Sequence, residues 1–348
     1  MTGCASSAIL GHFYSIVQGI DFMKNPFIGS DFYHDRKDSF THLHLHTQYS
    51  LLDGAIRLKD LFVKAKEFNM PAVACTDHGN LFGGIDFYTR ALSAGIKPIL
   101  GSEIYFTPGS RHDRRAPRNL KTLASQDEVE GKHQIHHLIL LCKNLQGYRN
   151  LCKLLSVAYQ EGFYYKPRAD MELLREYSEG LIATTACLKG EVGYNFFTGQ
   201  DERAGAAVKK LREVYQDDFY LEIQENGIPE QVDVNKKVIS FAKEFSIPLV
   251  ATNDCHYVTR EDASAQEVLM CVQTGKTFED EKRMKLSSSE FYFKSAEEMR
   301  QAFDYIPEAC DNTLKIADQC NLLIISLTSW YHRTKASLLG PRHRFRMT

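Results

Sequence analysis

Phe40-Thr-His-Leu-His-Leu-His46 alternates histidine with leucine over its last five positions. This alternation predicts a β-strand, because neighbouring side chains of a strand point to opposite faces. His42, His44 and His46 then share one face. Three imidazoles this close would repel one another if all were protonated, whereas a metal ion binds neutral rings. Taken alone, the segment indicates either a metal site or a surface strand with exposed histidines.

Around this segment, short apolar runs alternate with segments of helical periodicity. Further strands are expected at 72–76, 98–106, 137–142, 181–187, 219–223 and 248–253, and helices at 58–68, 84–92, 148–158, 207–214 and 234–245. Seven strands mostly separated by helices predict an α/β fold of parallel βα units. No glycine-rich dinucleotide fingerprint follows the first strand, which favours closure into a seven-stranded barrel over an open sheet.

The expected divisions of the chain are an N-terminal extension, the barrel, a mostly helical segment that starts a second unit, and a basic tail, at 1–39, 40–285, 286–322 and 323–348. Met23 offers a second start site within the extension. The capping-box pattern Ser295-Ala-Glu-Glu298 opens the helical segment. The tail is basic because no Asp or Glu occurs from Gln319 onward.

The composition limits the class of protein. The 348 residues include 42 Lys and Arg against 44 Asp and Glu, a balance that excludes a basic nucleic-acid coat protein. Nine cysteines without a Cys-x-x-Cys pair are typical of reduced cytosolic thiols. No apolar run reaches the ~18–20 residues of a membrane span. We therefore expect a cytoplasmic protein that does not associate with membranes.

An arginine-rich polar loop is expected at 109–132. Its basic residues are Arg111, Arg114, Arg115, Arg118 and Lys121. Such a cluster is able to contact DNA phosphates, but a solvated surface loop is the interpretation we favour.

Residues that bind metals recur where the expected strands end. They are Asp77 and His78 after the second strand, Glu103 in or just after the third, Cys187 at the end of the fifth, and Asp254 and His256 at the end of the seventh. The carboxyl ends of parallel barrel strands open on one face, so these side chains are expected to converge there. His137 fits this rule less well, since it begins its strand.

The chemistry of these ligands narrows the reaction. Histidines with several carboxylates favour zinc or manganese, with iron next and magnesium still open. One tetrahedral ion cannot use so many ligands, so two or three divalent ions are expected. Clustered ions activate water and neutralise charge at a phosphoryl centre. The pattern therefore predicts a metal-dependent hydrolase, of which a phosphoesterase is the favoured kind.

Several ordered motifs resemble the amino-terminal PHP (polymerase and histidinol phosphatase) domain of bacterial replicative DNA polymerase III alpha subunits. They are His42-Leu-His-Leu-His-Thr-Gln-Tyr-Ser50-Leu-Leu-Asp53-Gly54, Thr76-Asp77-His78-Gly79-Asn80, Gly95-Ile-Lys-Pro-Ile-Leu-Gly101-Ser-Glu103, Tyr165-Lys-Pro-Arg168, Cys187-Leu-Lys-Gly190-Glu191 and Ala251-Thr-Asn-Asp254-Cys-His256-Tyr257. The resemblance extends over roughly residues 40–325. It implies a distorted (βα) barrel, metal binding, and membership of a nucleotidyltransferase family that acts in DNA replication.

The resemblance also implies a ligand set. The positions that match the family's metal site are His44, His46, Asp53, His78, Glu103, His137, Cys187, Asp254 and His256. Through bound metals, Glu103, Asp254 and His256 are the expected catalytic residues, and the implied activity is 3′–5′ exonuclease, or proofreading, hydrolysis. The implied partners are DNA, the remaining polymerase domains and other replisome subunits. His42 is expected beside the site and not among its ligands.

The resemblance stops after Cys320-Asn321-Leu322, where the family continues into the polymerase. The acid-free tail differs from that continuation, and we expect a truncation or frameshift. No Asp-x-Asp pair occurs in the chain, so polymerisation is not expected of it. Two alternatives to the exonuclease remain. One is a non-catalytic, metal-stabilised scaffold that docks replisome subunits, and the other is a free-standing PHP phosphatase.

Overall fold

In the computed structural model, the described residues are 38–114, 134–281, 283–286 and 288–324. By their contacts, residues 27–322 form one unit, and residues 1–26 with 323–348 form another, which is described only at Leu323 and Ile324. The expected N-terminal extension and basic tail therefore lie almost wholly outside the described residues. The same holds for Arg115, Arg118 and Lys121 of the arginine-rich loop.

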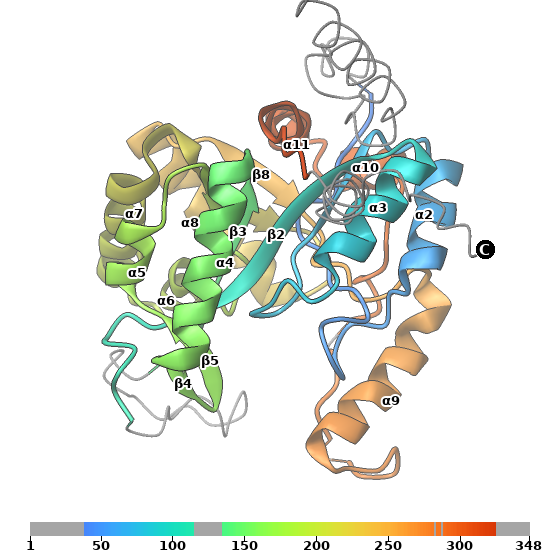
Figure 1. Cartoon of the computed structure of the whole chain (residues 1–348), viewed down its shortest axis with the longest axis horizontal. Coiled ribbons are helices and arrows are strands. Elements are labelled where there is room, and N and C mark those ends of the chain that lie inside the picture. Colours follow the sequence, from blue (N-terminus) through green and yellow to red (C-terminus); the bar gives the residue numbers. More distant parts are fainter. Residues whose placement is uncertain (1–37, 115–133, 282, 287, 325–348) are drawn as a thin grey trace, which may run out of the picture. The chain divides into compact units, whose positions relative to one another are not determined.

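A mixed eight-stranded sheet forms the centre of the main unit (Figure 1). Its strands are β1 (Ala72–Cys75), β2 (Lys97–Phe106), β3 (His136–Cys142), β4 (Phe163–Tyr164), β5 (Lys166–Ala169), β6 (Leu181–Thr184), β7 (Phe219–Gln224) and β8 (Leu249–Thr252). Their order is β4-β5-β2-β3-β6-β7-β8, and β1 pairs with the first half of β2. Because helices cover the sheet, β2 and β7 are buried along their whole length.

Residues 42–47 close the sheet into a ring. On one side Ala74 donates its N–H to the carbonyl of His42 at 2.8 Å, and on the other His46 donates to the carbonyl of Cys255, beyond β8, at 2.8 Å. The continuous strand expected at 40–46 is wrong, because this segment bends at His44 and pairs with each neighbour only through isolated bridges. The expected ring of seven is confirmed as this segment with β1, β2, β3, β6, β7 and β8.

Strand β3 departs from the expected parallel arrangement. It runs antiparallel to both of its neighbours, β2 and β6, whereas the other pairs within the ring are parallel. The polar segment 109–132 before β3 has no helical periodicity, and a parallel crossover requires a long connection that is usually a helix. As a result, β3 begins at the end of the barrel where the other strands finish.

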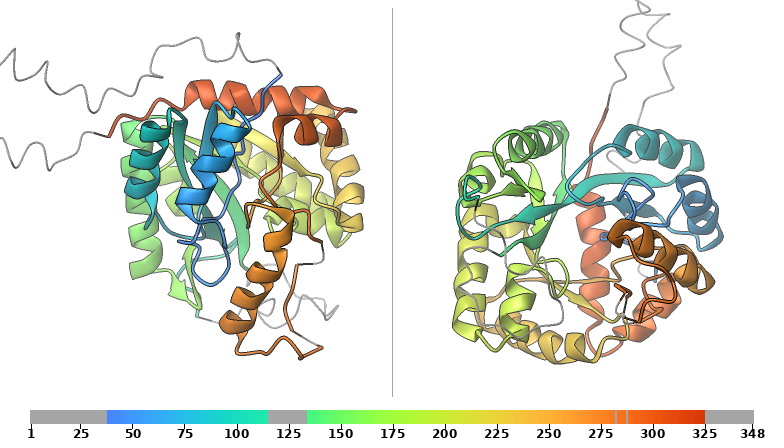
Figure 2. Two further views of the ribbon diagram at one scale, coloured as in Figure 1. Left: turned by 90° about the vertical axis from the view of Figure 1, so that its right-hand side faces the viewer. Right: turned by 90° about the horizontal axis from the view of Figure 1, so that it is seen from below.

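Helices surround the strands (Figure 2). They are α2 (Leu58–Glu67), α3 (Gly84–Ala94), α4 (Leu145–Gln160), α5 (Met171–Glu176), α6 (Glu191–Phe197), α7 (Asp201–Tyr215), α8 (Pro229–Phe245), α9 (Ala263–Thr274), α10 (Ala296–Ala302) and α11 (Pro307–Gln319). In α2, the buried Leu58, Leu61, Phe62 and Ala65 repeat with helical spacing and face the core. Among the described residues, no helix combines the length and apolarity that crossing a membrane requires.

The helical segment after residue 286 belongs to the same unit as the barrel. The capping box at its start is confirmed, since Ser295 N–H donates to Glu298 at 2.7 Å and Glu298 N–H donates to Ser295 Oγ at 3.2 Å. The single helical stretch expected here is divided into α10 and α11, because Pro307 disfavours a helical residue before it. The second unit expected to start here is therefore part of the barrel core.

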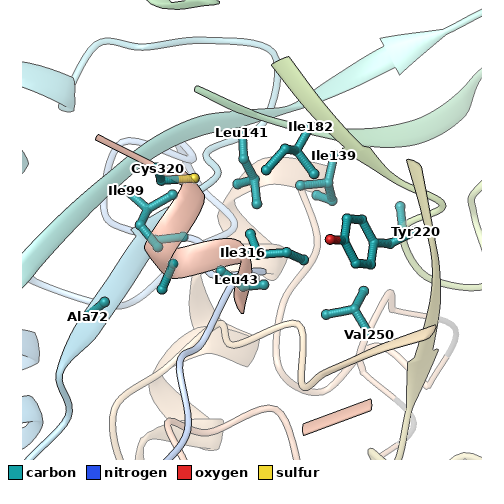
Figure 3. Packing of buried hydrophobic residues seen from close by; sticks show 13 residues of the cluster. Leu43, Ala72, Ile99, Ile139, Leu141, Ile182, Tyr220, Val250, Ile316 and Cys320 are labelled. Atoms are coloured by element: carbon teal, nitrogen blue, oxygen red, sulfur yellow. The ribbon is translucent and has the colours of Figure 1, made fainter. Parts of the chain in front are cut away.

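Helix α11 closes the end of the barrel where the parallel strands begin. Its buried Ile316, Ala317 and Cys320 pack among barrel residues that include Leu43, Ala72, Ile99, Leu141, Ile182 and Val250 (Figure 3). Asn312 also donates to the carbonyl of Leu249 at 2.7 Å, at the start of β8. Figure 2 shows α11 across one end of the unit and α9 projecting from the opposite end.

Ile316→Ala tests whether α11 and the barrel share one core. Because Ile316 is completely buried, the substitution should lower the free energy of unfolding by about 2–5 kcal/mol. Denaturant unfolding should remain a single transition. Val63→Ala, at an exposed position of α2, is the control and should change stability by less than about 0.5 kcal/mol. Separate unfolding of α11 in Ile316→Ala would contradict the shared core.

Candidate metal centre

The antiparallel orientation of β3 brings His137 to the same end of the barrel as the other candidate ligands. His78 follows β1, Glu103 lies in the second half of β2, and His137 is the second residue of β3. These three meet directly. Glu103 lies 2.6 Å from His78, between Oε2 and Nδ1, and 2.9 Å from His137, between Oε1 and Nδ1.

Glu103 also reaches the two histidines of the ring-closing segment. Its Oε1 lies 3.3 Å from His44 Nε2, and its Oε2 lies 3.5 Å from His46 Nε2. Asp254, beyond β8, contacts the same two nitrogens through Oδ1, at 3.1 and 3.2 Å. Four histidines from three separate parts of the chain therefore surround one carboxylate, and a second carboxylate lies alongside it.

Several of these atoms are buried and have no hydrogen-bond partner among the residues that the structure describes. They are both carboxylate oxygens of Glu103, Oδ1 of Asp254, and Nδ1 of His78 and His137. The atoms are close together, but they are not oriented for hydrogen bonding. Leaving such groups unpaired costs about 1–3 kcal/mol each. Cations placed among them would satisfy all of them.

Three groups of ligand atoms, each within 4.8 Å of one another, overlap in this region. They are His46, His78 and His256; His44, His46 and Glu103; and His78, Glu103 and His137. Because the groups share members, the donors form one continuous cluster of imidazole nitrogens and carboxylate oxygens. This donor set fits divalent transition metals better than calcium, which prefers oxygen ligands.

A tight loop returns Asp53 to the cluster. Its Oδ2 lies 3.0 Å from His78 Nε2, and its Oδ1 lies 3.8 Å from His256 Nε2. The loop depends on Gly54, where an added Cβ would collide with the carbonyl oxygen of Thr47. Side-chain exposure is 21 % for Asp53 and 11 % for both His78 and His137, against 0 % for His44. The cluster is therefore open to solvent on the Asp53 side.

Asp254 has a left-handed backbone conformation, with a φ of 51°. This conformation costs a residue other than glycine about 1 kcal/mol. The turn is held in place by Asn253, whose Nδ2 donates to the carbonyls of Glu290 and Tyr292 at 2.7 and 2.8 Å. The turn points both Asp254 and His256 into the cluster.

The electrostatics of the cluster keep its carboxylates ionised. Burial alone would raise the pKa of Glu103, but the rings of His137, His78 and His44 hold that pKa well below its usual range. Likewise, against its burial, His44 and His256 hold the pKa of Asp254 well below its usual range. A metal site needs this state of its carboxylates, because carboxylate ligands bind without their protons.

The histidines divide into two kinds. Burial, with His78 and His256 nearby, lowers the pKa of His46 to about 3. Against its own burial, Glu103 and Asp53 raise the pKa of His78 to about 9. His46 is therefore neutral, which is the state that binds metal, whereas His78 carries a proton that an arriving cation would displace.

Glu222 supports the cluster through its contact with His44, and it is not among the site residues expected from the sequence. This residue is buried in the middle of β7, and its Oε1 lies 2.7 Å from His44 Nδ1. Gln224 donates to the same oxygen at 2.9 Å, and the Thr184 hydroxyl donates to Oε2. With Nδ1 bonded to Glu222, Nε2 of His44 faces Glu103 and Asp254. The available signal is a single carboxylate, between Leu221 and Ile223, in an expected strand whose other residues are apolar or aromatic.

Asp77 organises the loop that carries His46. Its carboxylate accepts hydrogen bonds from Thr47 N–H and Ser50 Oγ, both at 2.7 Å. Ser50 Oγ lies 3.1 Å from His46 Nδ1, so this chain of hydrogen bonds directs Nε2 of His46 toward the cluster. Asp77 itself therefore orients a candidate ligand and does not belong to the three groups.

Two further residues lie at the margin. Cys187 follows β6 and is not a member of the three groups. Burial, together with the negative charges of Asp254 and Glu103, raises the pKa of its thiol. His42 has other contacts, since its Nε2 lies 2.8 Å from the carbonyl of Lys294 and its Nδ1 lies 3.4 Å from Cys255 Sγ.

The described part of the arginine-rich loop is held by acidic residues. Arg111 is buried and contacts Glu161 at 2.8 Å, Asp170 at 3.1 Å and Glu172 at 2.7 Å. Its guanidinium is therefore not available to DNA.

Comparison with known proteins identifies the family of this chain. The family model described as PHP domain matches residues 42–226, which is more than half of the chain. The chain belongs to the PHP domain family. The match covers the ring-closing segment and every strand of the sheet except β8.

This PHP domain is similar to curated DNA polymerase III alpha subunits. It is 47% identical to the protein of Borreliella burgdorferi over 285 residues, and 46% identical to that of Aquifex aeolicus over 286 residues. The alignments cover 82% and 80% of this chain, and 24% of each relative. The chain thus spans about a quarter of the length of the curated relatives it matches.

The solved structures that match this chain are less similar to it in sequence. An amidohydrolase from Chromobacterium violaceum has a TM-score of 0.38 and 15% identity, covering 63% of this chain and 88% of the other. A two-domain Bacteroides vulgatus protein, described as containing a predicted PHP-like metal-dependent phosphoesterase, has a TM-score of 0.38 and 12% identity, with coverages of 78% and 63%.

Glu222→Gln should weaken metal binding about 10- to 100-fold, which is the usual effect of losing the carboxylate behind a ligating histidine. The glutamine keeps the shape of the side chain but removes the anion that orients His44. Isothermal titration of the metal-free protein with Zn²⁺ and Mn²⁺ measures the change. Glu230→Gln, in the first turn of α8, is the matched control and should bind as the wild type does. Equal affinities in all three proteins would contradict the role of Glu222.

Proposed function

We propose that this PHP domain is a metal-dependent phosphoesterase that hydrolyses phosphodiesters at the 3′ end of DNA. The observation that carries the proposal is a set of buried oxygen and nitrogen atoms of Glu103, Asp254, His78 and His137 that make no hydrogen bond within the described part of the chain. These atoms face one another at a place that solvent reaches from one side. Neither a folded core nor a surface strand requires such an arrangement, whereas a multinuclear metal site does.

The ligands we assign are His44, His46, Asp53, His78, Glu103, His137, Cys187, Asp254 and His256. They would hold two or three divalent ions, zinc or manganese in preference to iron or magnesium. When bound, such ions supply Lewis acidity, which lowers the pKa of water and neutralises phosphate charge. Glu103, Asp254 and His256 are the residues that we expect to act through these ions.

The chain's own residues prepare the site for a phosphate. Glu222 and Ser50 orient His44 and His46. Lys189, exposed in the loop after β6, lies beside the cluster, since its carbonyl oxygen accepts a hydrogen bond from His137 N–H at 3.1 Å. An ammonium at this position is able to bind a phosphate oxygen as substrate enters.

DNA is the substrate that the relatives favour, since their name is DNA polymerase III subunit alpha. On the same basis, we propose that this domain works in the cytoplasm with the remaining polymerase domains and other replisome subunits. Nucleotide addition would belong to those other domains. We therefore expect no template-directed incorporation of nucleotides by this chain alone.

Removal of metal should destabilise the domain. An ion that binds only the folded state, at about 100 times its dissociation constant, contributes about 2.7 kcal/mol. For a domain of this size, EDTA should then lower the melting temperature by roughly 5–10 °C. Glu103→Gln should abolish this difference, whereas Glu297→Gln, in the first turn of α10, should retain it. Identical melting curves with and without EDTA for the wild type would contradict metal binding.

Asp254→Asn should lower the rate of mononucleotide release from single-stranded DNA by more than about 100-fold. Loss of a group that only hydrogen-bonds to a metal ligand already lowers activity about 10- to 100-fold, and Asp254 is assigned as a ligand itself. The substrate is a 3′-labelled oligonucleotide with Mn²⁺ or Zn²⁺, and released label is measured over time. Asp233→Asn, on the exposed side of α8, is the control. Metal binding without hydrolysis of DNA or of small phosphomonoesters would favour the scaffold instead. Hydrolysis of monoesters alone would favour a phosphatase.

A further inference from the structure

The β4–β5 hairpin presents aromatic side chains to solvent beside the metal centre. Tyr165 at its turn is 60 % exposed and Phe163 is 47 % exposed. Phe163 stacks on Tyr159 of α4 with 6.1 Å between ring centroids, and Tyr165 meets Tyr164 edge to face at 4.7 Å. With Tyr159, which is also exposed, these rings form an aromatic patch of the kind that marks a site of interaction. The hairpin projects at the same end of the domain as α9 (Figure 1).

Tyr105 connects this hairpin to the metal centre. Its ring centroid lies 6.0 Å from that of His78 and 5.6 Å from that of His137. Lys166 begins β5, and its Nζ lies over the same Tyr105 ring, 4.9 Å from the ring centroid. The pairing of Tyr105 with Arg168 fixes the hairpin on the edge of β2. The hairpin therefore lies next to His78 and His137, on the partly exposed side of the cluster that also carries Asp53.

Cations accompany the aromatic residues. The Lys166 ammonium lies over the Tyr105 ring, and that ring in turn contacts the ring of His78, whose Nε2 lies 3.0 Å from Asp53. Lys189 is exposed in the loop after β6, and its carbonyl oxygen accepts a hydrogen bond from His137 N–H at 3.1 Å. Arg114 is exposed and donates to the carbonyl of Phe163. The nearby acidic group of Glu161 is already paired with Arg111.

The turn of the hairpin is strained. Tyr165 has a φ of 64°, in the left-handed region that favours glycine or asparagine. A bulky aromatic residue there costs about 1–3 kcal/mol. The conformation reverses the chain between β4 and β5 and leaves the tyrosine ring outside the core. The turn geometry favours glycine or asparagine and does not by itself require a tyrosine at this position.

We propose that the β4–β5 hairpin, with Lys166 and Lys189, is the binding site for single-stranded DNA that leads its 3′ end to the metal centre. Bases stack on Tyr165 and on the Phe163–Tyr159 pair, and the two lysines hold phosphates next to Asp53. The statement that the 3′ end of the DNA is the end that reaches the metal centre rests on the proposed function. Single strands are the class that fits, because their bases have free faces, whereas the bases of a duplex stack on one another.

The test measures binding without catalysis. Anisotropy of a 5′-fluorescein oligothymidylate is read in EDTA, which stops metal-dependent hydrolysis. Tyr165→Asn keeps the left-handed turn but removes the ring, and should weaken binding about fivefold or more. Tyr165→Trp keeps a stacking surface and should bind at least as tightly as the wild type. Phe197→Ala, an exposed aromatic position at the end of α6, is the control and should leave binding unchanged.

Lys166→Gln tests the phosphate contact separately. The slope of log affinity against log salt concentration should become smaller by about 0.7, the value for one phosphate of a single strand. Lys59→Gln, exposed on α2, should leave the slope unchanged. An abasic strand of equal length should bind the wild type and Tyr165→Asn equally, because it offers no base to stack.

The outcomes separate this proposal from the proposed function. Binding that depends on Tyr165 and Lys166, in a chain that hydrolyses no DNA when metal is supplied, supports the binding site and contradicts the exonuclease. If the wild type hydrolyses DNA but Tyr165→Asn binds the oligothymidylate as tightly as the wild type does, the binding site is overturned and the proposed exonuclease activity is not. An equal loss for the abasic strand, or no binding by the wild type, also overturns the binding site.

Discussion

A buried carboxylate, Glu103, lies within 3.5 Å of imidazole nitrogens from four histidines, and the rest of the structure is arranged around this contact. Those histidines come from the ring-closing segment, from the end of β1 and from the start of β3. They meet only if the sheet closes into a ring and if β3 is antiparallel to its neighbours β2 and β6. Strand β2, which carries Glu103, must also lie between β1 and β3. A fold that placed any of these elements differently would leave an ionised group buried without partners, which is costly.

The two ends of the barrel have opposite characters for a physical reason. At the end where the parallel strands begin, α11 buries Ile316, Ala317 and Cys320 against the strands, so that this end is apolar and closed. At the other end, polar side chains project from strand ends and loops, and Glu222 below them satisfies His44. The closed end provides stability from burial of apolar surface. The open end lowers the stability of the fold, because it contains buried charged groups and a left-handed turn at Asp254.

Much of this arrangement follows from patterns in the sequence. The ring of seven and the helices at 58–68 and 234–245 follow from periodicity, because a buried face imposes its repeat on the residues that form it. The direction of β3 does not follow, since an apolar run reads the same in either direction. The bend at His44 was also missed, because alternation indicates an extended chain and not which neighbour it pairs with. Glu222 does not follow from the pattern either, because it lies within an otherwise apolar strand and its partner His44 is distant in the sequence.

By itself, the sequence determined the kinds of side chain available to the site, their order along the chain, and the repeats that commit segments to helix or strand. It also determined which residues match the motifs of the PHP domain family. Only the tertiary structure decided that His137 joins the cluster, that α11 belongs to the barrel core, and that the β4–β5 hairpin lies beside Asp53. The reason is physical. Local patterns act over a few residues of chain, whereas these contacts join residues far apart in sequence whose meeting depends on the direction of β3 and on how the sheet closes.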